Sequence, residues 1–214
     1  MKNYVTVVII HYNTPELLSE TISSFRVYYP DVPMLVIDNG SDETHVQQLE
    51  LLQQTYSTEV IYLPENIYHG PAMDYAVDKV KTPYIFFLDS DTRTEHGAFL
   101  EKMVSELDQD GNNYGIGKRK KINTRGFTDK NGFYALSTPF MMIAKKHYNS
   151  LPAFIHHGIP TVRNFKQATE MGLNLLHFPI EDYIYHKGRG TAEKFGYGLG
   201  LRGKLDFILN KMGI

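Results

Sequence analysis

Short apolar runs alternate with helical patterns along the first part of the chain, and this order restricts the possible folds most strongly. Strands are predicted at residues 5–10, 34–37, 59–63 and 84–88. The segments between them have helical spacing, and the first helix is predicted to start at Pro15 with Thr14 as its N-cap. A β-α-β-α-β-α-β order with short connections predicts an α/β fold with a doubly wound, mainly parallel sheet.

The second part of the chain is less regular. Residues 115–132 are polar and basic, and Pro139 within an apolar run indicates an edge strand or a bulge. The other predicted elements are strands at 134–144, 173–178 and 182–186 and helices at 164–171 and 201–212. We find no internal repeat and no low-complexity linker. The sequence therefore predicts a single domain over residues 1–214, with a first half at 1–110 and a smaller second half at 111–214.

Composition excludes several classes of function. The 214 residues are 42% hydrophobic and 21% charged, and their net charge of −2 creates no overall field toward nucleic acid or an anionic membrane. The absence of cysteine excludes disulfides, thiolate metal sites and cysteine nucleophiles. No apolar stretch reaches the ~20 residues of a transmembrane segment. We expect a cytoplasmic protein, with peripheral membrane association left open.

Polar residues follow each of the four predicted strands, and those after the last strand are the most informative. The carboxyl ends of parallel strands meet at one edge of a sheet, where such folds bind ligands. Asp89 and Asp91 lie at this edge on either side of Ser90, and two close carboxylates repel unless a cation lies between them. Mg²⁺ and Mn²⁺ bind to one or two carboxylates plus phosphate oxygens. The motif therefore predicts a divalent metal that also holds a diphosphate.

These strand ends resemble the family 2 glycosyltransferases of the GT-A fold. The resemblance is carried by residues 7–13, 36–42 and 86–91, together with Asn66, Gly70 and Ala72. It covers roughly the first hundred residues. It is weaker beyond them, where it rests on His186 and the following residues 187–191. The resemblance implies a Rossmann-like nucleotide-binding half followed by a smaller acceptor-side half.

The resemblance also implies roles for individual residues. Asp89 and Asp91 would hold Mn²⁺ or Mg²⁺, with His186 completing the metal ligands. Asp38 would hydrogen-bond the base of a nucleotide-sugar, and the remaining donor contacts would come from Tyr12, Asn13, Asn66, Ser90 and Arg189. The implied reaction moves a hexosyl or pentosyl group from a nucleotide-diphosphate sugar, with a UDP-sugar favoured, to an acceptor hydroxyl. An inverting outcome is expected.

The sequence departs from the family pattern at three places. Tyr68 stands where a glycine is usual, and Asp74 where an asparagine is usual. The stretch 156–163 contains no carboxylate, although inverting members carry an acidic pair there. His156 and His157 are therefore candidate bases because imidazole is competent near neutral pH. Asp182, beside Glu181, is a further candidate.

The acceptor and two alternative functions stay open at this point. The acceptor can be a glycan, a lipid-linked precursor or a modified nucleic acid. The basic run 118–121 is either a solvated face or a contact for phosphate groups. A nucleotidyltransferase can use the same carboxylates, and a binding module can keep the pocket without the catalysis. A glycine-rich, basic loop after the first strand would favour the nucleotidyltransferase, and residues 11–14 do not form one.

Overall fold

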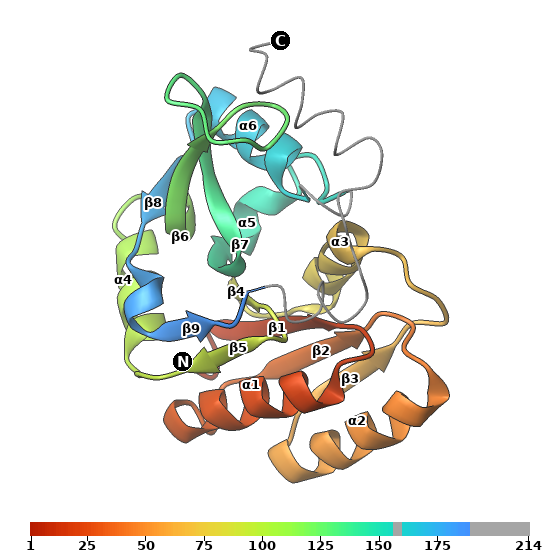
Figure 1. Ribbon diagram of the computed structural model, residues 1–214. Helices are drawn as coiled ribbons and strands as arrows, with labels where there is room; N and C mark the ends of the chain where they lie inside the picture. The colour runs from red at the N-terminus through yellow and green to blue at the C-terminus, as the bar shows by residue number, and fades with distance from the viewer. Residues whose placement is uncertain (156–159, 189–214) are drawn as a thin grey trace.

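A seven-stranded sheet forms the centre of the protein in the computed structural model, which describes residues 1–155 and 160–188 (Figure 1). The strand order is β3-β2-β1-β4-β7-β6-β8. All neighbouring pairs are parallel except the two that involve β7. The strands are β1 (Val5–His11), β2 (Met34–Asp38), β3 (Glu59–Tyr62), β4 (Tyr84–Leu88), β6 (Asn113–Ile122), β7 (Phe133–Ala144) and β8 (Asn174–His177). The mainly parallel sheet predicted from the sequence is confirmed.

Helices cover both faces of this sheet. Hydrophobic side chains of α1 (Pro15–Tyr28), α2 (Glu43–Tyr56) and α4 (Phe99–Leu107) pack on one face. Those of α3 (His69–Lys79), α5 (Lys145–Tyr148) and α6 (Val162–Glu170) pack on the other. Figure 1 shows α1 and α2 together on the side of the sheet opposite α3. None of the helices in the described part of the chain is long and apolar enough to cross a bilayer.

The apolar runs form central strands because both faces of each strand are buried. In β4, Phe86 faces one hydrophobic core and Phe87 faces the other. Phe86 is fully buried and contacts Phe99 of α4, with ring centroids 5.4 Å apart. Full burial of such a side chain contributes about 2 kcal/mol. Helix α1 starts at Pro15 with Thr14 as its N-cap residue, as predicted.

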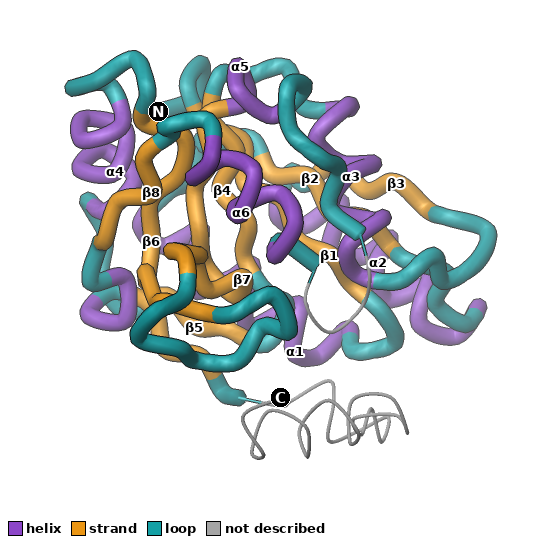
Figure 2. Tube along the Cα trace, turned by 90° about the horizontal axis from the view of Figure 1, so that it is seen from above, coloured by secondary structure: helices purple, strands orange, loops and turns teal. Residues whose placement is uncertain are grey.

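A second, two-stranded sheet lies beside the first. It pairs β5 (Thr92–Thr94) with β9 (Ile184–His186) in antiparallel orientation. The short 3-10 helix η1 (Ile180–Asp182) precedes β9 in the chain. Strand β5 lies beside α1, where Thr92 and Thr94 form hydrogen bonds with Thr21 and Ser24 (Figure 2). Neither β5 nor α4 was predicted from the sequence. The predicted terminal helix at 201–212 lies outside the described residues.

Strand β7 is an internal strand, with β4 on one side and β6 on the other. Its register against β6 is irregular, because β6 advances from Gly117 to Arg119 while β7 goes from Met141 to Leu136. The extra residues of β7 form a bulge that contains Pro139. Of the two sequence-based alternatives for Pro139, the bulge is therefore correct and the edge strand is wrong. The Pro139 carbonyl accepts a hydrogen bond from the Asp89 backbone N–H at 2.9 Å.

Candidate active site

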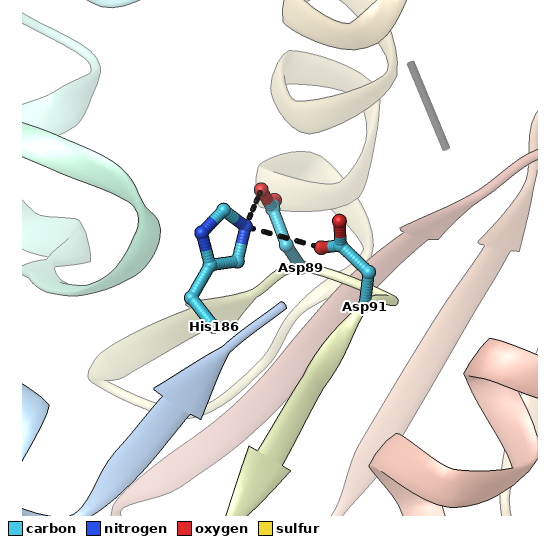
Figure 3. A group of neighbouring side chains, drawn as sticks. All are labelled: Asp89, Asp91 and His186. Carbon is cyan, nitrogen blue, oxygen red and sulfur yellow. Dashed lines mark ion pairs between the residues drawn. The ribbon is translucent and has the colours of Figure 1, made fainter. Parts of the chain in front are cut away.

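Asp89, Asp91 and His186 come together at the carboxyl edge of the sheet (Figure 3). Asp89 follows directly after β4, and Asp91 directly precedes β5. The pairing of β5 with β9 sets Thr92 opposite His186, which brings the imidazole beside the two carboxylates. His186 Nε2 lies 3.2 Å from Asp91 Oδ1 and 3.9 Å from Asp89 Oδ2. Two distant segments thus build one group of side chains.

The electrostatics of this group suit a divalent cation. One ligand atom from each of the three residues lies within 4.8 Å of the others. Desolvation raises the pKa of Asp89 above its ordinary value. The charges of His69 and His186 lower this pKa, and that of Asp91 raises it, by smaller amounts. The hydrogen bond to Asp91 is the main reason why the pKa of His186 is raised. Two carboxylates and an imidazole form an oxygen and nitrogen ligand set that fits Mn²⁺, and Mg²⁺ with more water.

Hydrogen bonds from a neighbouring helix hold the turn that carries the two aspartates. The buried Thr21 hydroxyl of α1 donates to the Ser90 carbonyl at 2.9 Å and lies 2.8 Å from the Thr92 carbonyl. It also accepts from the Thr92 backbone N–H at 3.2 Å. Together with the bond between Asp89 and Pro139, these contacts fix both ends of the turn. The backbone of the turn that carries the two carboxylates is therefore held at both of its ends.

His69 is a further residue of the site that was not predicted from the sequence. It opens α3, and its Nε2 lies 3.9 Å from Asp89 Oδ1. Its side chain is partly exposed, as are those of Asp89 and His186. The signal was present in the sequence, because His69 closely follows Asn66 at the end of the third predicted strand.

A buried network joins the ends of β1 and β2. His11 Nε2 accepts from the Thr14 backbone N–H at 3.1 Å, so the proton of a neutral ring lies on Nδ1. Nδ1 donates to Asp38 Oδ1 at 3.0 Å. Ser41 donates to the same carboxylate through its hydroxyl and, at 3.2 Å, through its backbone N–H. Asp38 is 1% exposed, so its carboxylate first of all joins the ends of β1 and β2, and its predicted contact with a base stays a prediction.

Asn13 ties the loop after β1 to the loop after β2. Its backbone has φ of +51°, in the left-handed region that asparagine tolerates. Its backbone N–H donates to Ser41 Oγ at 2.9 Å, and its side chain exchanges two hydrogen bonds with Asp42. Tyr12 lies next to it in the same loop and is half-buried. Their predicted contact with the nucleotide stays a prediction.

The loop after β3 is fastened by two asparagines. Asn39 Nδ2 donates to Asn66 Oδ1 at 3.1 Å, and Asn39 Oδ1 accepts from the Ile67 backbone N–H at 3.0 Å. Asn66 Oδ1 also accepts from the Tyr68 backbone N–H at 2.9 Å. Tyr68 has φ of +70° and ψ of 165°, a region populated almost only by glycine. The residue that departs from the family's usual glycine is thus a strained, exposed tyrosine beside His69.

The remaining candidate residues are not all brought to this edge. Asp182 is exposed in η1, which precedes β9, whereas His186 is the last residue of that strand. It therefore lies at the opposite end of β9 from the two aspartates. Lys187 donates its backbone N–H to the Asp91 carbonyl at 3.0 Å and forms an ion pair with Glu20. His156, His157 and Arg189 lie outside the described residues.

Fold and site together define an α/β domain with a group of two aspartates and a histidine that could hold a metal ion at the carboxyl edge of its sheet. The sequence pattern of glycosyl transferase family 2 matches residues 6–168, so the chain belongs to that family. Among curated proteins, it is similar to the teichoic acid poly(glycerol phosphate) polymerase of Staphylococcus epidermidis. The two are 27% identical over 106 residues, which are 47% of this chain and 15% of that protein.

Solved structures of GT-A glycosyltransferases have the same fold. A mannosyltransferase from Pyrobaculum calidifontis, in complex with GDP-Man and Mn²⁺, matches with a TM-score of 0.69 and 13% identity, over 84% of this chain and 55% of that one. GalNAc-T7 with UDP, GalNAc and Mn²⁺ gives 0.68 and 15%, over 86% and 43%. S. aureus TarS with UDP-GlcNAc gives 0.61 and 17%, over 85% and 58%. This chain spans less than two thirds of each of these proteins. The predicted GT-A fold is confirmed.

Proposed function

We propose that this chain transfers a sugar from a nucleotide-diphosphate sugar to an acceptor hydroxyl, with a divalent cation held by Asp89, Asp91 and His186. The observation that carries the proposal is that ligand atoms of these three residues lie within 4.8 Å of one another at the carboxyl edge of the sheet. Structural neighbours in complex with Mn²⁺ and a nucleotide or nucleotide sugar support it. We propose Mn²⁺ or Mg²⁺ as the cation. Of the two, Mn²⁺ is favoured by an imidazole beside the carboxylates.

The proposed chemistry is a displacement at the anomeric carbon. The acceptor oxygen forms a bond to this carbon while the bond to the diphosphate breaks, and the hydroxyl proton passes to a base. The bound cation supplies charge neutralisation for the departing diphosphate. Thr21 and Pro139 keep the two carboxylates in place through their bonds to the turn. A single displacement inverts the configuration, and His156 and His157 are the proposed bases.

The proposed donor is a UDP-sugar, and its pocket is formed by the loops after β1, β2 and β3. Tyr12, Asn13 and Asp38 would line the base and ribose side of the pocket. Asn66, Ser90 and Arg189 are the further proposed contacts. The curated relative is named a teichoic acid poly(glycerol phosphate) polymerase, which supports a phosphate-containing polymer as the acceptor, beside the glycan and the lipid-linked precursor predicted from the sequence.

The substitution Asp91→Asn tests the proposal. It keeps the shape of the side chain but removes a charge from the metal group, so metal-dependent donor turnover should fall by about a hundredfold or more. Asp78→Asn, on the exposed side of α3, is the matched control and should keep the wild-type rate. Turnover is measured as UDP release from UDP-sugars with Mn²⁺, and circular dichroism checks the fold. A folded Asp91→Asn variant with the wild-type rate would contradict the proposal.

A further inference from the structure

A two-stranded ribbon extends from the sheet at the edge that carries Asp89. Strand β8 pairs with β6 only as far as Gly117, and β4 pairs with β7 only as far as Phe140. Beyond these points β6 and β7 have only each other as sheet neighbours. We call residues 118–136 the basic arm; they comprise the end of β6, the connecting loop and the start of β7. Figure 1 shows this arm ending in a loop far from α1 and α2.

The arm leaves the sheet beside the metal group. Strands β4 and β6 are both antiparallel to β7, so they run in the same direction and their carboxyl ends face the same way. Pro139, whose carbonyl binds the Asp89 backbone N–H, lies three residues from Leu136, the partner of Arg119. Three residues of strand span at most about 10 Å. Leu136 is therefore within about 10 Å of Pro139, and the arm begins close to the turn that carries Asp89.

Charge on the arm differs in sign from charge on the rest of the chain. Residues 118–130 contain six basic side chains and one acidic side chain, Asp129, and therefore have a net charge of +5. The whole chain has −2, so the other residues together have −7. A local basic segment on an acidic protein attracts an anionic partner to one place.

Three of the six basic side chains of the arm form no ion pair within the described part of the chain. Lys118 forms an ion pair with Glu181 of η1. No carboxylate of the described residues forms an ion pair with Arg119, Lys120 or Lys121. Desolvation, followed by the repulsion of Lys118, lowers the pKa of Lys120. Binding of an anion would reduce the repulsion between these like charges.

The two faces of the ribbon both carry positive charge. Side chains alternate along a strand, so Lys118 and Lys120 point to one face and Arg119 and Lys121 to the other. The Arg119 guanidinium lies 4.2 Å, and the Lys121 ammonium 5.2 Å, from the ring centre of Tyr134. A planar membrane surface would contact only one face of the ribbon and would leave the charges of the other face unused. A nucleic-acid base would need a free aromatic face to stack on, and two cations already lie against Tyr134.

We propose that the basic arm binds the phosphate groups of an anionic acceptor chain and presents an acceptor hydroxyl to the sheet edge. This inference rests on the proposed glycosyl transfer and names the acceptor class as a flexible, phosphate-bearing chain without bases. Lysine and arginine on both faces of a narrow ribbon can contact successive phosphates of such a chain. The acceptor would then lie across the arm, with the end of the chain toward Asp89.

The test compares two pairs of lysines that carry the same charge. The arm variant is Lys120→Gln with Lys121→Gln. The control is Lys81→Gln with Lys146→Gln, two exposed lysines at the opposite, amino edge of the sheet. The probe is a fluorescently labelled oligo(glycerol phosphate), and its binding is followed by anisotropy at low and at moderate salt. The arm variant should bind about tenfold more weakly and with a smaller salt dependence, while the control binds like the wild type.

A charge-preserving variant separates lost charge from lost structure. Lys120→Arg with Lys121→Arg keeps both cations and should bind the probe within about twofold of the wild type. Equal probe binding by the arm and control variants would overturn the proposal. It would also be overturned if the arm substitutions weakened binding only to phosphatidylglycerol vesicles or to a single-stranded oligonucleotide. Donor turnover by the wild type is assayed separately, and a lack of turnover would contradict the proposed function. Binding of the probe by the variants tests the role of the arm independently of that result.

Discussion

Single residues at the strand ends hold the loops of the proposed donor site together through hydrogen bonds. Asp38 is the clearest example, because its oxygens accept from His11 and from both donors of Ser41. Its burial would be costly without these bonds, since an unpaired carboxylate loses its hydration. The same residue that the family resemblance assigns to the donor therefore also stabilises the fold.

The buried pair of His11 and Asp38 gives a stability prediction. His11→Phe fills a similar volume but removes the Nδ1 donor, and it leaves the carboxylate only partly satisfied. The free energy of unfolding should fall by about 3 kcal/mol. The double variant His11→Phe with Asp38→Leu should regain part of this loss, because no buried charge remains. Urea denaturation measures both values, and an unchanged midpoint for His11→Phe would show that the bond contributes little.

The raised pKa of His186 leads to a prediction about pH. A protonated imidazole cannot bind a metal, and the bond to Asp91 keeps the proton on His186 to a higher pH than usual. Affinity for Mn²⁺ should therefore rise with pH and level off only above the raised pKa of His186. Titration calorimetry in buffers of different ionisation enthalpy would detect the released proton. In His186→Ala the affinity should be lower and its dependence on pH flatter; an equally steep dependence would assign the proton to another group.

At the scale of elements, the loops after β2 and β3 are in close van der Waals contact. Gly40 has φ of +75°, and a Cβ atom added there would lie 2.4 Å from the Glu65 backbone carbon. Both features require glycine at this position. The close approach allows Asn39 to reach Asn66, and in this way it sets the distance between two walls of the proposed donor pocket.

Replacement of this glycine gives a prediction for the element. Gly40→Ala forces the loop that carries Glu65 and Asn66 to move, and it places a side chain in the left-handed region. The free energy of unfolding should fall by about 2–4 kcal/mol, and affinity for UDP should weaken. Gly111→Ala is the matched control, because its added Cβ meets no atom within 4 Å. Similar urea midpoints for the two variants would show that the loop adapts at little cost.

The elements also show where sequence patterns lose their predictive value. Strands β1 and β4 are visible because burial on both faces makes them continuously apolar. The end of β6 is a strand made of Lys118, Arg119, Lys120 and Lys121, all exposed, so no apolar period marks it. Its conformation comes from pairing with β7. Periodicity reports burial, and it does not report pairing between exposed residues.

On the scale of the whole molecule, the metal group joins two parts of the chain that lie far apart in sequence. Asp89 and Asp91 come from the turn after β4, and His186 comes from the end of β9. A cation bound by all three would connect the main sheet with the small one. Binding of the cation would then stabilise the complete fold.

This arrangement predicts stabilisation by metal. At free Mn²⁺ of about a hundred times its Kd, the folded state should gain about 2.7 kcal/mol. For a chain of this size the melting temperature should rise by about 5–10 °C. Differential scanning fluorimetry with and without MnCl₂ measures the shift, and Asp91→Asn should lose most of it. A shift of equal size in that variant would mean that Mn²⁺ binds elsewhere.

The sequence by itself determined the α/β class, the first four strands and the position of Asp89 and Asp91 after the fourth. These features follow from local patterns, because buried parallel strands are apolar and their ends are polar. Only the tertiary structure decided that His186 meets the two carboxylates, that His69 lies opposite them and that Asp182 lies at the far end of β9. It also decided that the basic run forms a ribbon at the same edge as the metal group. Such contacts join residues distant along the chain, and they depend on strand pairing that no local pattern contains.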